Sequence, residues 1–477
     1  MEALAADWAR LSRLHFDLAS LGDERRSKRL VKTAELIFKS PAGSLPDKLP
    51  DWADLTGLYR LVAAEQVTHA AVIQPHLKRT LDQMRRSAGV VLLPHDTTEL
   101  DFTGHEEVAG ELGQIGNGGG RGYLCHNTLA ITPDKRVIGL ASQILHHRRK
   151  VGKNETARQK REHPDRESRL WIRGCEQVGP APQGVLWVDI CDRGSDSFEF
   201  LEYEHTHQRS YVIRSSKDRS LDGEDHLGSD RIHCTLHGYA RDLPTLLTRQ
   251  VEVAASTKKG SKARRATVRI ACAPITLAAP KQPRGQCSRS SLPLWVIHVA
   301  EINPPSDVAP LEWVLLSNVP VETPQQAAER VDWYNCRPII EDYHKGQKTG
   351  LGIELPQFES ADRLEPVIGI LSVVAAVLLQ LRHAARDPES EHVAATERVP
   401  ELWVKIIAAK VYTHPRKQSK KFDELSVKEF FVGVACLGGH LARKNDGPPG
   451  WQTLWRGWRK LHLMIEGAEA ALAEKCV

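Results

Sequence analysis

Two short apolar runs, each leading into an aspartate, constrain the fold of this chain most strongly. Residues 90–93 (VVLL) lie three positions before Asp96, and the mostly apolar residues 185–191 (VLWVDIC) end at Asp192. Continuous apolar runs of this length are typical of strands that are covered on both faces of a sheet. We therefore expect two buried strands, each with a carboxylate at its end.

The segments around these runs alternate between strand and helix patterns. The expected elements are a strand hairpin at 123–132 and 137–145, helical segments at 154–178 and 197–205, and a strand at 210–214. A three-strand meander, then helix, strand, helix and strand, with a later helix, is the order of an RNase H-like domain. The analogy brings Asp96, Asp192 and the later acid Glu341 to one point, although fold alone does not establish activity.

The later helix is expected within the stretch 334–350, YNCRPIIEDYHKGQKTG. Its polar residues Tyr334, Arg337, Glu341, Lys345 and Lys348 follow at steps of three, four, four and three, which keep them on one helix face. A single acid among cations could bind a metal ion while its neighbours hold phosphate oxygens. The stretch alone also fits a solvated helix face with Glu-Lys pairs.

Pro338 interrupts this stripe, because proline lacks a backbone donor and clashes with the preceding turn of a helix. Thr323, followed by Pro324 and Gln326, has the pattern of a capped helix start. We therefore expect one helix over 324–336, a break, and a second helix from Pro338 to Lys348 that closes at Gly350.

The spacing Tyr-x2-Arg-x3-Glu-x6-Lys resembles the signature of bacterial insertion-sequence DDE transposases of the Tyr-Arg-Glu-Lys (YREK) subgroup, which includes the transposon-five transposase. The sequence EINPP at 301–305, Trp313 before a leucine-rich run, and the stretch 341–381 are also similar to that family. The resemblance continues towards both ends of the chain.

The resemblance implies a catalytic triad of Asp96, Asp192 and Glu341 that binds two Mg²⁺ ions, with Mn²⁺ able to substitute. It also implies DNA contacts by the four cationic and phenolic signature residues Tyr334, Arg337, Lys345 and Lys348.

Three further residues match positions with a family role. Trp313 corresponds to a tryptophan that stacks on a flipped base, and Arg214 to a contact with the DNA backbone. Asp196 also has a counterpart in the family. From the residues alone, Trp313 fits a core aromatic and Asp196 fits a helix N-cap.

The implied function is cut-and-paste transposition. Metal-activated water nicks each transposon end, the freed 3′-hydroxyl forms a hairpin on the opposite strand, a second hydrolysis opens it, and the end joins target DNA. The implied partners are double-stranded DNA, as terminal inverted repeats and as target, and a second copy of the chain in a homodimer.

The N-terminal residues favour DNA binding through a basic helix. The sequence LGDERRSKRL at 21–30 carries Arg25, Arg26 and Arg29, which could hold DNA phosphates or form a plain surface helix. Together with Tyr59 and Arg60, this stretch resembles the family domain that recognises the transposon end.

The fold class that we expect is α/β: an RNase H-like core with helical domains on either side. The boundaries are a DNA-end-binding domain at 1–70, a catalytic core at 71–385 and a C-terminal dimerisation domain at 386–477. Within the core, strands at 251–255, 266–273, 294–300 and 311–316 predict an inserted β-rich subdomain at about 220–320. The periodic tryptophans of the last helix, from Trp451 to Trp458, fit either a dimer contact or a local core.

Composition agrees with a soluble cytoplasmic protein. Hydrophobic residues are 41% and charged residues 26% of the 477 residues, and the net charge is only +5, although basic residues cluster at 25–32, 146–161, 258–265 and 410–421. The nine cysteines show no zinc spacing, and the start lacks the pattern of a signal peptide. The apolar run 367–381 is shorter than the about 20 residues of a membrane span, so we expect a core helix and no membrane partner.

Two alternatives remain open from the sequence. A catalytically silent repressor derived from a transposase would bind DNA without cutting it. Another RNase H-like nuclease would cut DNA but would need no end-specific binding and no strand transfer.

Overall fold

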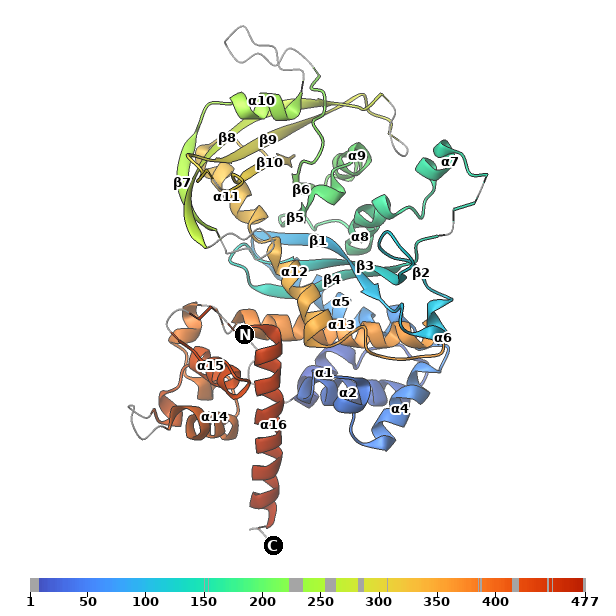
Figure 1. Cartoon of the computed structure of the whole chain (residues 1–477), viewed down its shortest axis with the longest axis vertical. Coiled ribbons are helices and arrows are strands. Elements are labelled where there is room, and N and C mark those ends of the chain that lie inside the picture. The colour runs from blue at the N-terminus through green and yellow to red at the C-terminus, as the bar shows by residue number, and fades with distance from the viewer. Residues whose placement is uncertain are drawn as a thin grey trace.

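The computed structural model describes residues 8–149, 151–152, 154–222, 235–253, 263–281, 287–306, 308–384, 386, 388–413, 420–443, 446–447 and 449–474. Parts of three expected features lie outside these residues: the basic runs 258–265 and 410–421, and the strand 251–255. A large sheet with helices on its faces occupies one end of the molecule, and helical N-terminal and C-terminal regions lie side by side at the other (Figure 1).

The N-terminal region is helical, as the sequence predicts. Its helices are α1 (Trp8–Phe16), α2 (Glu24–Lys39), α3 (Leu45–Lys48), α4 (Trp52–Val62) and α5 (His69–Arg86). Asp23 caps α2 by accepting a hydrogen bond from the Arg25 amide, and Asp51 caps α4 through the amide of Ala53. Both helices bury one apolar face against the rest of the domain.

One mixed sheet runs through the described residues and contains ten strands. They are β1 (Val90–Asp101), β2 (Gly113–Gln114), β3 (Arg121–Ile131), β4 (Val137–His146), β5 (Leu186–Cys191), β6 (Ser210–Arg214), β7 (Leu247–Val253), β8 (Arg264–Ala278), β9 (Ser291–Glu301) and β10 (Glu312–Ser317). Their order is β2-β3-β1-β5-β6-β10-β9-β8-β7, and β4 pairs with β3. The pairs β1-β5 and β5-β6 are parallel, and all the others are antiparallel.

The two apolar runs form central strands, as expected. Val91, Leu92 and Leu93 in β1 and Val188 and Ile190 in β5 are fully or almost fully buried. Parallel pairing sets His95 opposite Cys191, so the residues that follow on each strand emerge next to each other. This register is what brings Asp96 and Asp192 together.

The strands β7 to β10 extend the same sheet. β10 pairs antiparallel with β6, so the strands that the sequence assigns to an inserted subdomain continue the sheet of the core. Their mutual pairing is regular over long stretches, notably between β8 and β9.

Helices cover both faces of the sheet. The shorter helices of this region are α6 (Glu106–Ala109), α7 (Ala157–Glu162), α8 (Leu170–Val178), α9 (Phe198–Thr206) and α10 (Leu236–Asp242), with 3-10 turns η1 (Glu167–Arg169) and η2 (Arg193–Ser195). The helices α5 and α13 (Ala361–Ala384) pack against β4, and α8 packs against β3 and β4. By length and composition α13 could cross a membrane, but 89% of its apolar window is buried inside the protein, in agreement with the core helix predicted from the sequence.

The segment after β10 holds the expected helix pair with shifted ends. Thr323 caps α11 (Pro324–Tyr334) in a capping box with Gln326, as predicted. The second helix, α12 (Pro338–Lys345), does not stay α-helical to Lys348: it continues as the π-helical turn η4 (Gly346–Gly350). Pro338 is at the first position of α12, where its missing N–H leaves no hydrogen bond unmade.

The C-terminal region contains α14 (Glu401–Ile407), α15 (Val427–Leu437) and α16 (Trp451–Glu474), with short turns η5 (Pro388–Glu391), η6 (Ala395–Glu397), η7 (Ala408–Tyr412) and η8 (Phe422–Glu424). The helices α15 and α16 touch through their backbones. A Cβ at Gly438 would lie 1.8 Å from the Thr453 carbonyl oxygen, and one at Gly457 would lie 1.8 Å from the Val434 carbonyl oxygen. Any side chain at either position would separate the two helices.

An aromatic cluster joins the two ends of the described chain. Trp8 is 3% exposed, stacks on Phe38 at 5.3 Å between ring centroids and meets Trp458 edge-on at 5.5 Å. Its indole Nε1 donates a hydrogen bond to His462 Nε2 on α16 at 2.9 Å. The N-terminal and C-terminal helical regions therefore share one core.

This cluster gives a prediction about stability. Trp8→Ala should lower the free energy of unfolding by about 3–5 kcal/mol, because it removes a buried aromatic and leaves a cavity. The matched control is Trp52→Ala, at a tryptophan that is 75% exposed, which should change it by less than about 0.5 kcal/mol. Urea unfolding of both variants checks this, and equal losses would contradict the shared core.

Candidate active site and DNA-binding groove

Asp96 and Asp192 lie side by side at the centre of the sheet. Asp192 follows the last residue of β5, as expected, and its Oδ1 accepts a hydrogen bond from the Gly194 amide at 2.8 Å. Asp96 does not end its strand, because β1 continues to Asp101 in pairing with β3. The aspartate that the sequence places at a strand end is therefore inside β1, next to the point where the parallel partner β5 stops.

Glu341 reaches the same point from α12, and the guanidinium of Arg337 contacts all three acids. Arg337 Nη1 donates to Glu341 Oε1 at 2.6 Å, while its Nη2 lies 3.0 Å from Asp96 Oδ2 and 3.5 Å from Asp192 Oδ2. Arg337 and Glu341 are one helical turn apart, so the backbone of α12 sets their spacing. The sequence-predicted triad is thus one cluster in the structure.

Burial and charge change the protonation of this cluster. Burial, together with the neighbouring charges of Asp192 and Glu341, raises the pKa of Asp96 to about 6, although Arg337 acts in the opposite direction. Burial alone would lower the pKa of Arg337, but Asp96 and Asp192 raise it. Arg337 therefore remains a permanent cation that partly offsets the repulsion among three carboxylates.

His344 is a neighbour of the acids that the sequence did not single out. Its Nδ1 lies 3.9 Å from Asp96 Oδ2, and its Nε2 forms a hydrogen bond of 3.1 Å with the Asn127 side chain. Burial, followed by the charges of Lys348 and Arg337, lowers the pKa of His344 to about 3, so the ring is neutral. The sequence could have indicated His344, because a residue three positions after Glu341 lies on the same side of a helix.

A buried polar network joins the two central strands just before the acids. His95 Nε2 lies 2.8 Å from Asp189 Oδ1, and Arg209 donates to both oxygens of Asp189 at 3.0 Å. Possible ligand atoms of His95, Cys175 and Asp189 lie within 4.8 Å of one another. Because the Asp189 oxygens already accept these bonds, the network acts as a brace between β1 and β5.

Three other predicted DNA contacts pack against one another beside the acids. Tyr334 is 6% exposed and meets the partly buried Trp313 edge-on, with ring centroids 5.4 Å apart. Arg214 Nη2 donates to the Glu312 carbonyl oxygen at 3.0 Å. In the free protein these side chains stabilise the junction of β6, β10 and α11.

The two lysines of the signature separate at the end of α12. Lys345 is 65% exposed and lies 4.0 Å from Asp342, whereas Lys348 is in the π-turn and forms a 3.0 Å ion pair with Glu354. Asp196 also differs from its expectation. Ser197 caps α9, while Asp196 accepts hydrogen bonds from the amides of Ser216 and Lys217 after β6.

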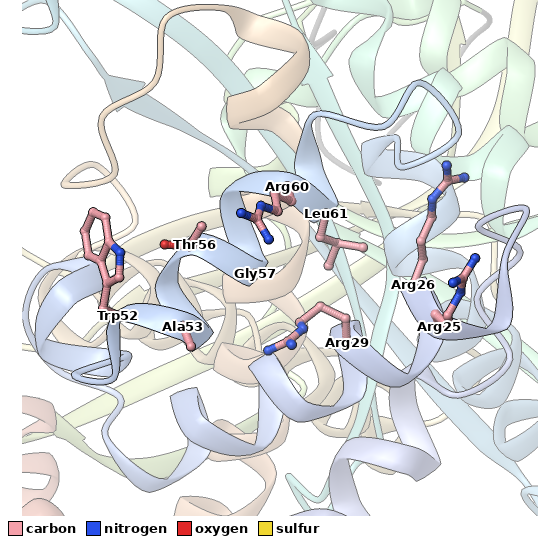
Figure 2. Close-up of a pocket in the computed structure, with 9 residues that line it drawn as sticks. All are labelled: Arg25, Arg26, Arg29, Trp52, Ala53, Thr56, Gly57, Arg60 and Leu61. Atoms are coloured by element: carbon pink, nitrogen blue, oxygen red, sulfur yellow. The ribbon is translucent and has the colours of Figure 1, made fainter.

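A second site is a groove of about 520 Å³ between α2 and α4 (Figure 2). It is lined by Arg25, Arg26, Arg29, Trp52, Ala53, Thr56, Gly57, Arg60 and Leu61. The Arg29 guanidinium packs over Gly57 of α4, since a Cβ there would lie 2.8 Å from the guanidinium carbon. The groove is therefore lined by several cations, and Gly57 leaves room for them where a side chain would occupy part of the groove.

The three arginines of α2 are engaged within the domain. Arg25 pairs with Asp23 at 3.0 Å, Arg26 donates to the Leu21 carbonyl and the Gln66 side chain, and Arg29 pairs with Asp54 at 2.7 Å. The bonds of Arg26 to Gln66 and of Arg29 to Asp54 connect α2 to neighbouring segments, whereas the Arg25 pair is local to the start of α2. The predicted phosphate contacts on α2 thus have partners already in the free protein.

Helix α4 presents side chains whose polar groups have no such partners. Trp52, Thr56 and Arg60 follow at steps of four and so share one face of α4. Within the described part of the chain Arg60 has no hydrogen bond or ion pair, the Thr56 hydroxyl has no partner but is itself buried, and Trp52 is 75% exposed. Tyr59 faces elsewhere and packs edge-on against Phe358 at 5.7 Å, so the structure does not bring it into the groove.

The N-terminal helices match a known family. A family model described as Transposase DNA-binding matches residues 6–67, which include α2, α4 and both walls of the groove. The match assigns DNA binding to this part of a mixed α/β protein. The match also supports the interpretation that this chain is a transposase.

The raised pKa of Asp96 gives a prediction about pH. Between the ordinary pKa of 3.8 and about 6, Asp96 holds a proton in the folded state that it has lost in the unfolded state, so the contribution of Asp96 to stability without divalent cations should fall as pH rises through that window. Asp96→Asn removes this cost and should raise the free energy of unfolding by up to about 3 kcal/mol at pH 7.5 and by much less at pH 4.

Urea unfolding in the presence of a chelator measures the free energy of unfolding of the wild type and of Asp96→Asn at pH 4 and at pH 7.5. The matched control is Asp134→Asn, at an exposed aspartate in the turn between β3 and β4, which should leave the pH dependence unchanged. A less stable Asp96→Asn protein at pH 7.5 would contradict the repulsion inferred for the cluster.

Proposed function

We propose that the chain is a cut-and-paste DNA transposase of the DDE type, in the YREK subgroup, with an RNase H-like catalytic core. Its reaction is metal-dependent cleavage at transposon ends through a hairpin intermediate, followed by strand transfer into target DNA. The observation that carries the proposal is that Asp96, Asp192 and Glu341 all lie within 3.5 Å of one guanidinium. The family match at residues 6–67 supports the DNA-binding half of the proposal.

The donor set fits magnesium or manganese. The cluster offers carboxylate oxygens from two strands and one helix, and hard divalent ions prefer such oxygens. Burial is the main cause of the raised pKa of Asp96, and the charges of Asp192 and Glu341 add to it; a bound cation would oppose both effects. Asp96, Asp192 and Glu341 would therefore hold two divalent ions, which supply a deprotonated water and shield the phosphate and the leaving oxygen.

The chain's own residues then divide the remaining work. The three carboxylates would hold the ions that neutralise and position the phosphate. Arg337, now a counter-ion of the acids, would turn to the phosphate, where its planar fork matches two oxygens. Lys345 and Lys348 would hold neighbouring phosphates, and Trp313 would stack on an extruded base after leaving Tyr334.

The same site would act repeatedly. Water would cleave one strand and leave a 3′-hydroxyl and a 5′-phosphate. The 3′-hydroxyl would attack the phosphodiester of the opposite strand, forming the hairpin and releasing the 3′-hydroxyl of the flanking DNA. Water would reopen the hairpin, and the restored 3′-hydroxyl would attack a phosphodiester of target DNA and release a target 3′-hydroxyl. Each step exchanges one phosphodiester bond for another or for a hydroxyl, so no further reactant is needed. The partners would be terminal inverted repeats and target DNA, held by a homodimer in the bacterial cytoplasm.

Cleavage of DNA that carries the ends of the chain's own element tests the catalytic proposal. The wild type with Mg²⁺ should give nicked and hairpin products, and Asp192→Asn should slow their formation by at least about 100-fold, because it removes a metal ligand. Asp134→Asn should cleave like the wild type. Binding without cleavage by the wild type would favour a silent DNA-binding protein.

Strand transfer separates a transposase from another nuclease of the same fold. The cleaved end should become joined to a plasmid when one is supplied. Products that are cut but never joined would favour the nuclease.

The free side chains of α4 give a separate prediction about end recognition. Arg60→Ala should weaken binding to end DNA by about 10-fold or more and lower the discrimination against unrelated duplex, as expected when a base contact is lost. Arg25→Ala should weaken both DNAs equally. The control is Arg265→Ala, 76% exposed and far from the groove on β8.

Fluorescence anisotropy at several salt concentrations measures these affinities. If Arg60→Ala weakened end DNA and unrelated DNA to the same extent, α4 would not read sequence, although the groove could still hold phosphates.

A further inference from the structure

The π-turn after Glu341 packs tightly against the C-terminal helix. Gly346 has ordinary helical angles, φ −60° and ψ −45°, where alanine would be favoured by about 1 kcal/mol. A Cβ at Gly346 would lie 3.0 Å from Cζ2 and 3.1 Å from Cη2 of Trp451 on α16. At Gly350 it would meet Trp451 and Trp455 at 3.5 Å. Glycine at 346 therefore has a steric reason, which is the indole ring of Trp451.

Arg382 links the same tryptophan to the residue beside Glu341. Its guanidinium lies 3.2 Å from Asp342 Oδ2 and 5.0 Å from the ring of Trp451, and its side chain is 8% exposed. A cation between a carboxylate and an aromatic face is attracted by both. Helices α12, α13 and α16 thus meet at Asp342, Arg382 and Trp451, which we call the clamp.

Glu341 itself depends on its backbone for its position. Its side chain is 50% exposed, and its single hydrogen-bonding partner among the described residues is Arg337. Helix α12 is short, and at its N-terminal end it joins α11 through a turn. The C-terminal end is held by Tyr343 and Gln347, which donate to Ser372 on α13, and by the clamp.

We infer that Trp451 and Arg382 are positioning residues that set where Glu341 and Lys348 lie. The inference rests on the proposed function for the role of Glu341. Trp451 blocks movement of the π-turn towards α16, and Arg382 holds Asp342, so a shift of α16 is transmitted directly to the acid. The placement of the C-terminal helix and the competence of the candidate active site are therefore coupled.

A bump-and-hole experiment tests the coupling. Gly346→Ala should slow Mg²⁺-dependent cleavage by about 10-fold, since the new Cβ must push the π-turn and Trp451 apart by a few tenths of an ångström and a catalytic constellation tolerates only about 0.5 Å, while binding of end DNA changes less than about 2-fold. In the Trp451→Leu background, which lacks the atoms that the new Cβ would meet, the same alanine should cost less than about 2-fold. The control is Gly467→Ala, at a glycine of α16 with open space around it, which should cleave normally.

Equal slowing by Gly346→Ala in both backgrounds would overturn the inference. So would a loss of DNA binding and of the unfolding midpoint in step with cleavage, because that pattern indicates general destabilisation.

Hydrogen exchange gives a readout that does not depend on catalysis. Trp451→Leu should speed amide exchange over residues 339–350 by about 10-fold or more and leave β1 unchanged. If the wild type did not cleave, the proposed function would fail, but this measurement would still decide the clamp. Unchanged exchange over 339–350 would exclude it.

Discussion

The guanidinium of Arg337 is the contact on which the candidate site depends. Three carboxylates from separate parts of the chain lie around one point, the first of them, Asp96, largely buried, and their charges repel unless a cation lies among them. Arg337 supplies that charge from the N-cap of α12, the helix that carries Glu341. Its ion pairs therefore connect this helix to the aspartates of the sheet. The parallel register of β1 and β5 is the second requirement of the site, because it sets Asp96 and Asp192 side by side.

The N-terminal groove differs, because several of its arginines already have partners within the domain. Its α2 arginines are already bound to Asp23, Gln66 and Asp54, and these bonds build the walls of the groove. Among the described residues that line the groove, the side chains that have no internal partner, and could therefore bind another molecule, are on α4.

The sequence was sufficient wherever local chemistry decides the outcome. Apolar runs predicted β1 and β5, the Thr323 capping box predicted the start of α11, and the run 367–381 predicted the core helix α13. It failed where distant segments decide: β1 continues past Asp96 because β3 pairs with it, and α12 becomes a π-turn where Trp451 and Trp455 pack against it. His344 and the pairings of Arg26 with Gln66 and of Arg29 with Asp54 were missed for the same reason, since these partners are far away in the chain.

The glycine contact between α15 and α16 has a consequence for mutational scanning. Gly438 and Gly457 each lie against a carbonyl oxygen of the opposite helix, so every replacement at either position must push the helices apart. A deep survey of variants would rank these two glycines beside Asp96 and Asp192 in intolerance. Intolerance in such a survey therefore marks steric necessity as readily as chemistry, and only an assay that separates folding from turnover would distinguish the two.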